Sequence, residues 1–280
     1  YTGYLHPTLS LEATACDETL GGWFVELLPD GSYTAPQAVI GTVAGGFEQA
    51  AAALVAFHRA DATVSCEVPP LVFNDYMDCV WATQDPALLH PLIDRAADVG
   101  CECFMIDGGW CTNAEQAPAG TWHVGDWLLR PEFYGKDGAG MKELADHILA
   151  RGMTPGIWFE FDACEYGVRL LGEDPDSVIR RYDRPVGKAG RYFYNFRNEN
   201  VRAFLKDCVR KFYDMGFRYI KNDFNQSAGI GCTYDDVPSA AEGLRQNTEA
   251  FYDFVEELYR TFPGLVIENC GSGALRADHG

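Results

Sequence analysis

The chain has 280 residues, of which 47% are hydrophobic and 13% aromatic, and a formal net charge of −19. This apolar content is enough for a sizeable core and excludes a disordered chain, while the acidic balance and the lack of a Lys/Arg cluster argue against a nucleic-acid partner. Since no run of 18 or more apolar residues occurs in the sequence, we also expect no membrane span.

Ten cysteines are scattered along the sequence without a CxxC pair, and the six histidines show no metal-ligand spacing. We therefore expect neither a metal site nor another cofactor. Mostly free thiols are typical of a reducing compartment, which favours a cytoplasmic location, with secretion as the alternative. The sequence begins at Tyr1 without a signal peptide, so we expect an N-terminus that is processed, trimmed or incompletely covered.

Residues 1–66 lack a regular alternation of strands and helices. They contain turn signals at 29–31 and 45–46 and an Ala-rich helical run from Phe47 to His58. We interpret 1–66 as the end of an N-terminal β-sandwich domain with a linker helix. The prolines at 69 and 70 mark the boundary, because two prolines break both a helix and a central strand. Residues 67–280 are the second predicted domain.

From residue 71 onward, short apolar runs alternate with helical patterns. The predicted strands are 71–76, 103–107, 156–160, 219–223 and 265–270, with a short strand-like piece at 192–195. One helix starts at Asp85-Pro86, as N-cap and first helical position, and stops at Gly100. The other predicted helices are 141–149, 200–215 and 240–262.

This order of strands and helices indicates an α/β fold with a parallel sheet covered by helices. An open doubly wound sheet and a TIM barrel both fit, but no GxGxxG follows the first strand. In a barrel, the polar residues that end the strands converge on one mouth: Asp75, Asp107, Glu160, Asp223 and Asn269. Only about five strands are predicted where eight close a barrel. We therefore expect a (β/α)8 TIM barrel that this chain covers only in part, incomplete at its C-terminal side.

Three segments carry residues suited to chemistry. Lys221, Asp223 and Asn225 alternate along one strand and so share a face, and an ionised carboxylate there suits attack on an anomeric carbon. A structural ion pair between Lys221 and Asp223 is the competing interpretation. Asp107 is followed by two glycines and Trp110, a combination of carboxylate and indole that can bind a sugar or form an ordinary turn. Trp158 is typical of a core position.

Taken together, eight segments resemble glycoside hydrolase family 36, the melibiase-like family of α-galactosidases and α-N-acetylgalactosaminidases, over about residues 33 to 280. The segments are FNDYM at 73–77, IDGGW at 106–110, GDW at 125–127, KELAD at 142–146, RGM at 151–153, GIWFE at 156–160, YIKNDFN at 219–225 and IENCGSG at 267–273. The stretch 33–47 looks like this family's exit from its N-terminal β-sandwich.

The resemblance implies a role for each matching residue. Asp223 would be the catalytic nucleophile, and the substrate-binding residues would be Asp107, Trp158, Arg191, Lys221, Asn225, Cys270 and Gly273. Among them, Asp107 would bind the O4/O6 edge of galactose, and Cys270 and Gly273 would line the pocket near C2. The family's general acid/base Asp lies a little beyond Gly280, so we expect it to be absent from this chain.

The activity implied is that of a retaining, exo-acting glycoside hydrolase that removes terminal α-linked galactose from oligosaccharides or glycoconjugates by double displacement. The chain departs from the family pattern at positions such as Gly108, where many members have a second Asp. These departures leave the identity of the sugar undecided. The alternatives are an α-N-acetylgalactosaminidase or α-galactosaminidase, a galactosyl transferase, and a non-catalytic carbohydrate-binding fragment. The partner is then an α-galactoside oligosaccharide or glycan, and assembly into a homo-oligomer is left open.

Overall fold

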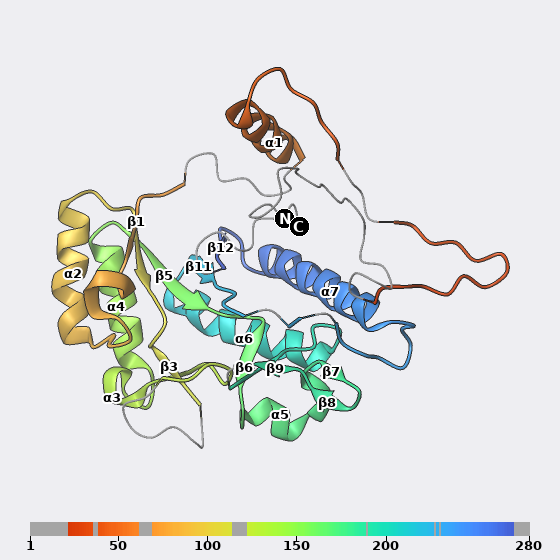
Figure 1. Ribbon diagram of the computed structural model, residues 1–280. Helices are drawn as coiled ribbons and strands as arrows, with labels where there is room; N and C mark the ends of the chain where they lie inside the picture. The colour runs from red at the N-terminus through yellow and green to blue at the C-terminus, as the bar shows by residue number, and fades with distance from the viewer. Residues whose placement is uncertain are drawn as a thin grey trace, which may run out of the picture.

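The computed structural model describes residues 22–35, 39–61, 69–113, 122–188, 190–226, 228–229 and 231–271. In this part of the chain, five parallel strands form the main sheet in the order β1-β2-β5-β11-β12 (Figure 1). They are β1 (Val72–Asn74), β2 (Cys103–Ile106), β5 (Thr154–Phe159), β11 (Tyr219–Asn222) and β12 (Val266–Asn269). From β2 onward, each strand pairs in parallel with the preceding main-sheet strand. Strand order follows chain order without the reversal of a doubly wound sheet, so the sheet is a curled part of a TIM barrel, as predicted.

Four helices connect these strands: α2 (Pro86–Asp98), α4 (Ala139–Ala150), α6 (Glu199–Met215) and α7 (Ala240–Thr261). All four confirm predicted helices to within a few residues. The side chain of Asp85 accepts a hydrogen bond of 2.9 Å from Ala87 N–H at the start of α2. Gly216, with φ of 110°, ends α6 in the left-handed region that favours glycine.

The two faces of the sheet differ in what covers them. Phe104, Ile157 and Ile220 belong to the main core, which contains buried side chains of all four helices. The alternate residues, among them Met105 and Tyr219, form a second, smaller cluster. Because side chains alternate along a strand, the polar residues at the carboxyl ends on this second face gather at one edge of the sheet.

Shorter elements fill the long connections after β2 and β5. An irregular turn, η1 (Tyr76–Val80), also follows β1. The other short elements are β3 (Cys111–Thr112), β4 (Leu128–Leu129), α3 (Pro131–Tyr134), β6 (Ala163–Glu165), α5 (Arg169–Glu173), η2 (Pro175–Ser177), β7 (Arg180–Arg181), β8 (Arg184–Pro185), β9 (Gly187–Lys188) and β10 (Arg191–Phe193). The strand predicted at 192–195 is β10, the middle strand of an antiparallel sheet with β6 and β9.

The N-terminal region holds the helix α1 (Phe47–Asp61), which confirms the predicted helical run. No strand is assigned to residues 22–35 and 39–46, and the predicted boundary near residue 66 lies outside the described residues. The division at residue 66 and the β-sandwich origin of this region therefore stay predictions. Trp23 and Phe24 contact the start of α7, where Phe24 N–H donates to Ser239 Oγ at 3.1 Å.

The eight cysteines within the described ranges are free thiols. Burial raises the pKa of the thiols of Cys103 and Cys208 to about 12. Within the same ranges, no three His, Cys, Asp or Glu side chains are grouped so that they could hold a metal ion. None of the helices described is both long and apolar enough to cross a membrane.

Candidate functional site

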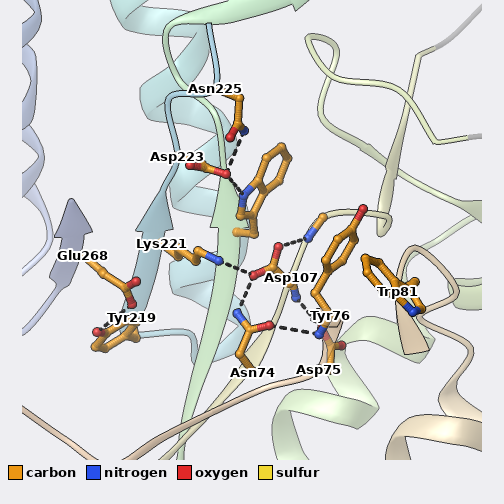
Figure 2. Close-up of polar contacts among 12 residues, drawn as sticks. Asn74, Asp75, Tyr76, Trp81, Asp107, Tyr219, Lys221, Asp223, Asn225 and Glu268 are labelled. Atoms are coloured by element: carbon orange, nitrogen blue, oxygen red, sulfur yellow. Dashed lines mark hydrogen bonds and ion pairs between the residues drawn. The ribbon is translucent and has the colours of Figure 1, made fainter. Parts of the chain in front are cut away.

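Asp223 lies directly after β11, at the carboxyl edge of the sheet, with 8% of its surface exposed. Its Oδ2 accepts hydrogen bonds from Asn225 Nδ2 at 2.7 Å and from the indole Nε1 of Trp158 at 3.3 Å (Figure 2). Its Oδ1 accepts from Phe224 N–H at 3.0 Å. These donors, from β5 and from the turn after β11, orient the carboxylate and compensate part of its charge.

Lys221 lies on the same face of β11, and its Nζ is 2.7 Å from Oδ2 of Asp107, which follows β2. The side chains retain only 19% and 7% exposure, so this is a largely desolvated ion pair. Burial alone would lower the pKa of Lys221, but the charge and hydrogen bond of Asp107, with smaller contributions from Cys270 and Asp223, raise it overall. The lysine is therefore a cation held between two carboxylates, bonded to Asp107 and attracted by Asp223.

The carboxylate of Asp107 is held by neighbours on β1 and in its own turn. Asn74 Nδ2 donates to Oδ2, and Gly108 N–H donates to Oδ1 at 2.7 Å. The main-chain N–H of Asp107 in turn donates to Oδ1 of Asp75 at 2.9 Å (Figure 2). Asp75 is completely buried, and this burial raises the pKa of its carboxyl group to about 7.

A second ion pair lies beside Asp223. Glu160, which follows β5 and is 1% exposed, is paired with Arg191 of β10. The other oxygen of Glu160 accepts from Asn225 N–H at 3.0 Å. The pair therefore connects the small antiparallel sheet to the turn that carries Asp223, and it anchors the backbone of the residue that donates to the carboxylate.

The structure brings most of the predicted site residues together at this edge. Asp107 is paired with Lys221, and Asp223 accepts from Trp158 and Asn225. The two groups are linked by the attraction between Lys221 and Asp223. Arg191 joins it through Glu160, and Cys270 lies buried after β12, where its N–H donates to Asn222 O at 2.9 Å. Gly273 lies outside the described residues.

Two sequence-based interpretations need correction. The hydrogen-bonded partner of Lys221 is Asp107 and not Asp223, because the lysine side chain crosses from β11 toward β2. The polar strand ends also do not all serve the mouth, since Asp75 lies buried beneath Asp107 and Glu160 is used by Arg191. Sequence reasoning missed Asn74, whose signal was its place one residue before Asp75 at the end of the same strand.

This arrangement combines an oriented carboxylate, an ammonium–carboxylate pair and a buried indole at the carboxyl edge of a parallel sheet. Such an edge is where barrel proteins hold their active sites. Carboxylate, ammonium and amide groups placed close together can bind several hydroxyl groups of one ligand at once. An ionised carboxylate among them can act as a nucleophile toward an electrophilic carbon.

Comparison with known families shows what the chain is similar to. A family model described as Melibiase matches residues 32–280. An α-galactosidase of Lactobacillus acidophilus is 25% identical over 219 residues, which cover 76% of this chain and 29% of that protein. The bifunctional α-galactosidase/sucrose kinase AgaSK of Mediterraneibacter gnavus is 29% identical over 198 residues, 68% of this chain and 19% of that protein.

Solved structures show the same fold. An α-galactosidase of Thermus thermophilus, in complex with p-nitrophenyl α-D-galactopyranoside, superposes with a TM-score of 0.56 at 26% identity, covering 78% of this chain and 41% of that one. The family 36 α-galactosidase AgaA of Geobacillus stearothermophilus, in complex with stachyose, has a TM-score of 0.65 at 18% identity, covering 76% and 29%. The chain thus spans about a third or less of the two curated relatives named above.

Proposed function

Because the chain belongs to the melibiase family, we propose that the protein removes terminal α-linked galactose from oligosaccharides or glycoconjugates, with Asp223 as the nucleophile. The observation that carries this proposal is the placement of Asp223 at the carboxyl end of β11, held by Trp158 and Asn225. The relatives named α-galactosidase and the galactoside bound in the Thermus thermophilus enzyme support the choice of sugar.

In the proposed reaction, a carboxylate oxygen of Asp223 attacks C1 of the galactosyl group while the bond from C1 to the leaving oxygen breaks. A covalent galactosyl-enzyme forms, and water attacking C1 then releases galactose and regenerates the carboxylate. A general acid must protonate the leaving oxygen and afterwards take a proton from water. We assign that role to no residue of this chain.

The neighbouring groups have distinct tasks in this proposal. Lys221 and Asp107 present a donor and an acceptor side by side, a combination that suits a pair of vicinal hydroxyl groups on the ring. Trp158 presents an indole that shapes the pocket beside the reacting carbon while its N–H fixes the nucleophile. Arg191, Asn225, Cys270 and Gly273 are proposed as further contacts of the sugar. We also propose a cytoplasmic location, on the strength of the free thiols.

Azide rescue tests the nucleophile directly. In the protein expressed from its whole reading frame, Asp223→Gly should lower kcat on an aryl α-galactoside by at least about 1,000-fold, because covalent catalysis is lost. Added azide should restore turnover and yield a galactosyl azide of inverted anomeric configuration, identified by NMR. Asp30→Gly is the matched control, since Asp30 is exposed in a turn with φ of 65°, where glycine fits without strain. A folded Asp223→Gly protein without azide product contradicts the assignment.

A further inference from the structure

Beneath Asp107, two buried oxygen atoms lack a hydrogen-bond partner among the described residues. They are Oδ2 of Asp75 and Oε1 of Gln84. Both residues are completely buried, and their side chains interact with each other. A buried oxygen without a hydrogen-bond partner is costly, so two at one place require an explanation.

The orientation of the Gln84 amide is determined by the main chain around it. Its Nε2 donates to Trp81 O at 2.6 Å and to Gly108 O at 3.0 Å, which uses both amide hydrogens. Turning the amide over would place its oxygen against two carbonyl oxygens, where no donor exists. The amide oxygen of Gln84 is therefore the acceptor that remains, and the carboxyl group of Asp75 is the neighbour that can supply a proton.

We propose that Asp75 carries a proton on Oδ2, donates it to Gln84 Oε1, and acts as a positioning residue for Asp107. One hydrogen bond then satisfies both oxygens. The other oxygen of Asp75 accepts the N–H of Asp107, so the neutral carboxyl group connects the loop 81–84 to the turn that aims Asp107 at Lys221. The part of this inference that concerns turnover rests on the proposed galactosidase function.

The charges around Asp75 favour the neutral form. The pKa of its carboxyl group is raised to about 7, by burial above all and also by the negative charge of Asp107. These effects outweigh the lowering effects of Asp107 N–H, of the Gln84 side chain and of the main chain of Asp75 itself. The thiol of Cys79 and the phenol of Tyr134 also interact with it, and neither is a cation. Two cations among the described residues nearby are engaged elsewhere: Lys221 with the carboxylate of Asp107, and Arg130 with Glu132 and with Gly109 O.

Selective 13C labelling of aspartate carboxyl groups in the protein expressed from its whole reading frame tests the proton itself. One carboxyl signal should titrate near pH 7, and it should be the signal that Asp75→Asn removes. Asp98→Asn is the control, because Asp98 is exposed on α2 and should remove a different signal. An Asp75 signal that titrates at the ordinary aspartate value near pH 4 overturns the proposal.

Kinetics test the positioning role. Asn at position 75 offers the same donor to Gln84 and the same acceptor to Asp107, so Asp75→Asn should keep kcat/KM on an aryl α-galactoside within about 3-fold at pH 6 and lose the decline of the wild type above about pH 7. Asp75→Ala and Gln84→Leu should each lower kcat/KM about 10-fold or more over the whole pH range.

The two arms separate the possible failures. If Asp75→Asn lowers kcat/KM as much as Asp75→Ala does, the neutral carboxyl group is not the active form and the positioning role is overturned. If the wild-type protein hydrolyses no galactoside, the proposed function fails, while the carboxyl titration still decides whether Asp75 holds its proton. Gln84→Leu serves should Asp75→Ala not fold, because it removes the proposed acceptor, and a titration of Asp75 that this variant leaves unchanged would overturn the proposed hydrogen bond.

Discussion

At the scale of single residues, the pair of Lys221 and Asp107 shows how this site controls buried charge. Two largely desolvated ions are costly to bury, and they are tolerated because each is satisfied by the other and by further groups. Asp107 accepts from Asn74 and Gly108 as well as from the lysine. Several hydrogen bonds therefore fix the positions of both charged groups, as the proposed binding of two hydroxyl groups by one donor and one acceptor requires.

A double-mutant cycle tests this coupling. Lys221→Met and Asp107→Asn should each lower kcat/KM on a galactoside by about 100-fold, because each removes a charge-assisted hydrogen bond and leaves its partner unpaired. The double variant should lose much less than the product of the two single losses, since neither charge is then left alone. Independent, fully additive losses would show that the two side chains act separately, and Lys142→Met, in an exposed pair with Asp146, should leave kcat/KM unchanged.

At the scale of elements, the close approach of the loop 81–84 to the turn after β2 depends on Gly109. This glycine has φ of 125°, and a Cβ built on it would lie 2.7 Å from Ala82 Cα and would collide with Gln84 Oε1. The glycine therefore does two things. It adopts a conformation that L-residues avoid, and it lets the loop that carries Gln84 pack against the base of the site.

Gly109→Ala should consequently destabilise the protein by more than about 3 kcal/mol, from backbone strain together with the collision. Gly152→Ala is the matched control, because Gly152 has φ of 80° but its Cβ would meet no atom within 4 Å. The control should cost only about 1 kcal/mol, the share due to backbone strain. Urea unfolding of both variants measures the difference, and equal losses would show that the close approach contributes nothing.

The start of α7 is a second place where distant segments are joined. Ser239 caps the helix by accepting Glu242 N–H at 3.3 Å and also donates its hydroxyl to Phe24 O at 2.8 Å. The carboxylate of Glu242 accepts from Trp23 and is paired with Arg245. The hydrogen bond from Arg245 lowers the pKa of Glu242 to about 2, despite the opposing effect of burial.

Because the folded-state pKa of Glu242 is depressed, its contribution to stability is complete above about pH 4.5, the unfolded value, and is lost as pH falls toward 2. Glu242→Gln should therefore lower the free energy of unfolding by roughly 2 kcal/mol at neutral pH, and the difference from wild type should shrink through that window. Glu249→Gln, an exposed partner of the same arginine, should change little at any pH. Urea unfolding at several pH values measures both, and a difference that does not vary with pH contradicts the prediction.

The long helices and the main strands could be predicted from the sequence because their signals are local. Asp85 with the following proline, and the glycine at 216, mark helix ends by their own backbone preferences. The two-residue strands β3 and β4 pair across the long connection after β2, and nothing in so few residues indicates a partner. The site residues show the same difference between local signals, which the sequence reveals, and contacts between distant segments, which it does not. Asp223 and Lys221 could be placed on one face by alternation, whereas the choice of Asp107 as the partner of Lys221 depends on neighbouring strands and became visible only in the structure.

At the scale of the whole molecule, the strand order explains why one edge of the main sheet holds most of the proposed sugar contacts that the structure describes, with Arg191 of β10 joined to it through Glu160. Parallel strands added in chain order place all their carboxyl ends on one side, so residues more than 100 positions apart, such as Asp107 and Lys221, meet there. A doubly wound sheet would instead form its site at the point where strand order reverses. In this curled sheet, the carboxyl edge thus carries the proposed chemistry. The outer face, which the helices cover, contributes the stability.

The net charge of −19 gives a test that separates the proposed neutral sugar from a cationic one. A neutral galactoside gains no attraction from an acidic surface, so its kcat/KM should change by less than about 2-fold between low salt and about 0.5 M NaCl, where charges are screened beyond a few ångström. An α-galactosaminide with a protonated amine is attracted to the same surface, and its kcat/KM should fall several-fold over that range. Initial rates on the two aryl glycosides at mildly acidic pH measure this contrast. If the galactosaminide is the better substrate at every salt concentration, the aminosugar alternative replaces galactose, because discrimination then arises in the pocket rather than in the field of the whole protein.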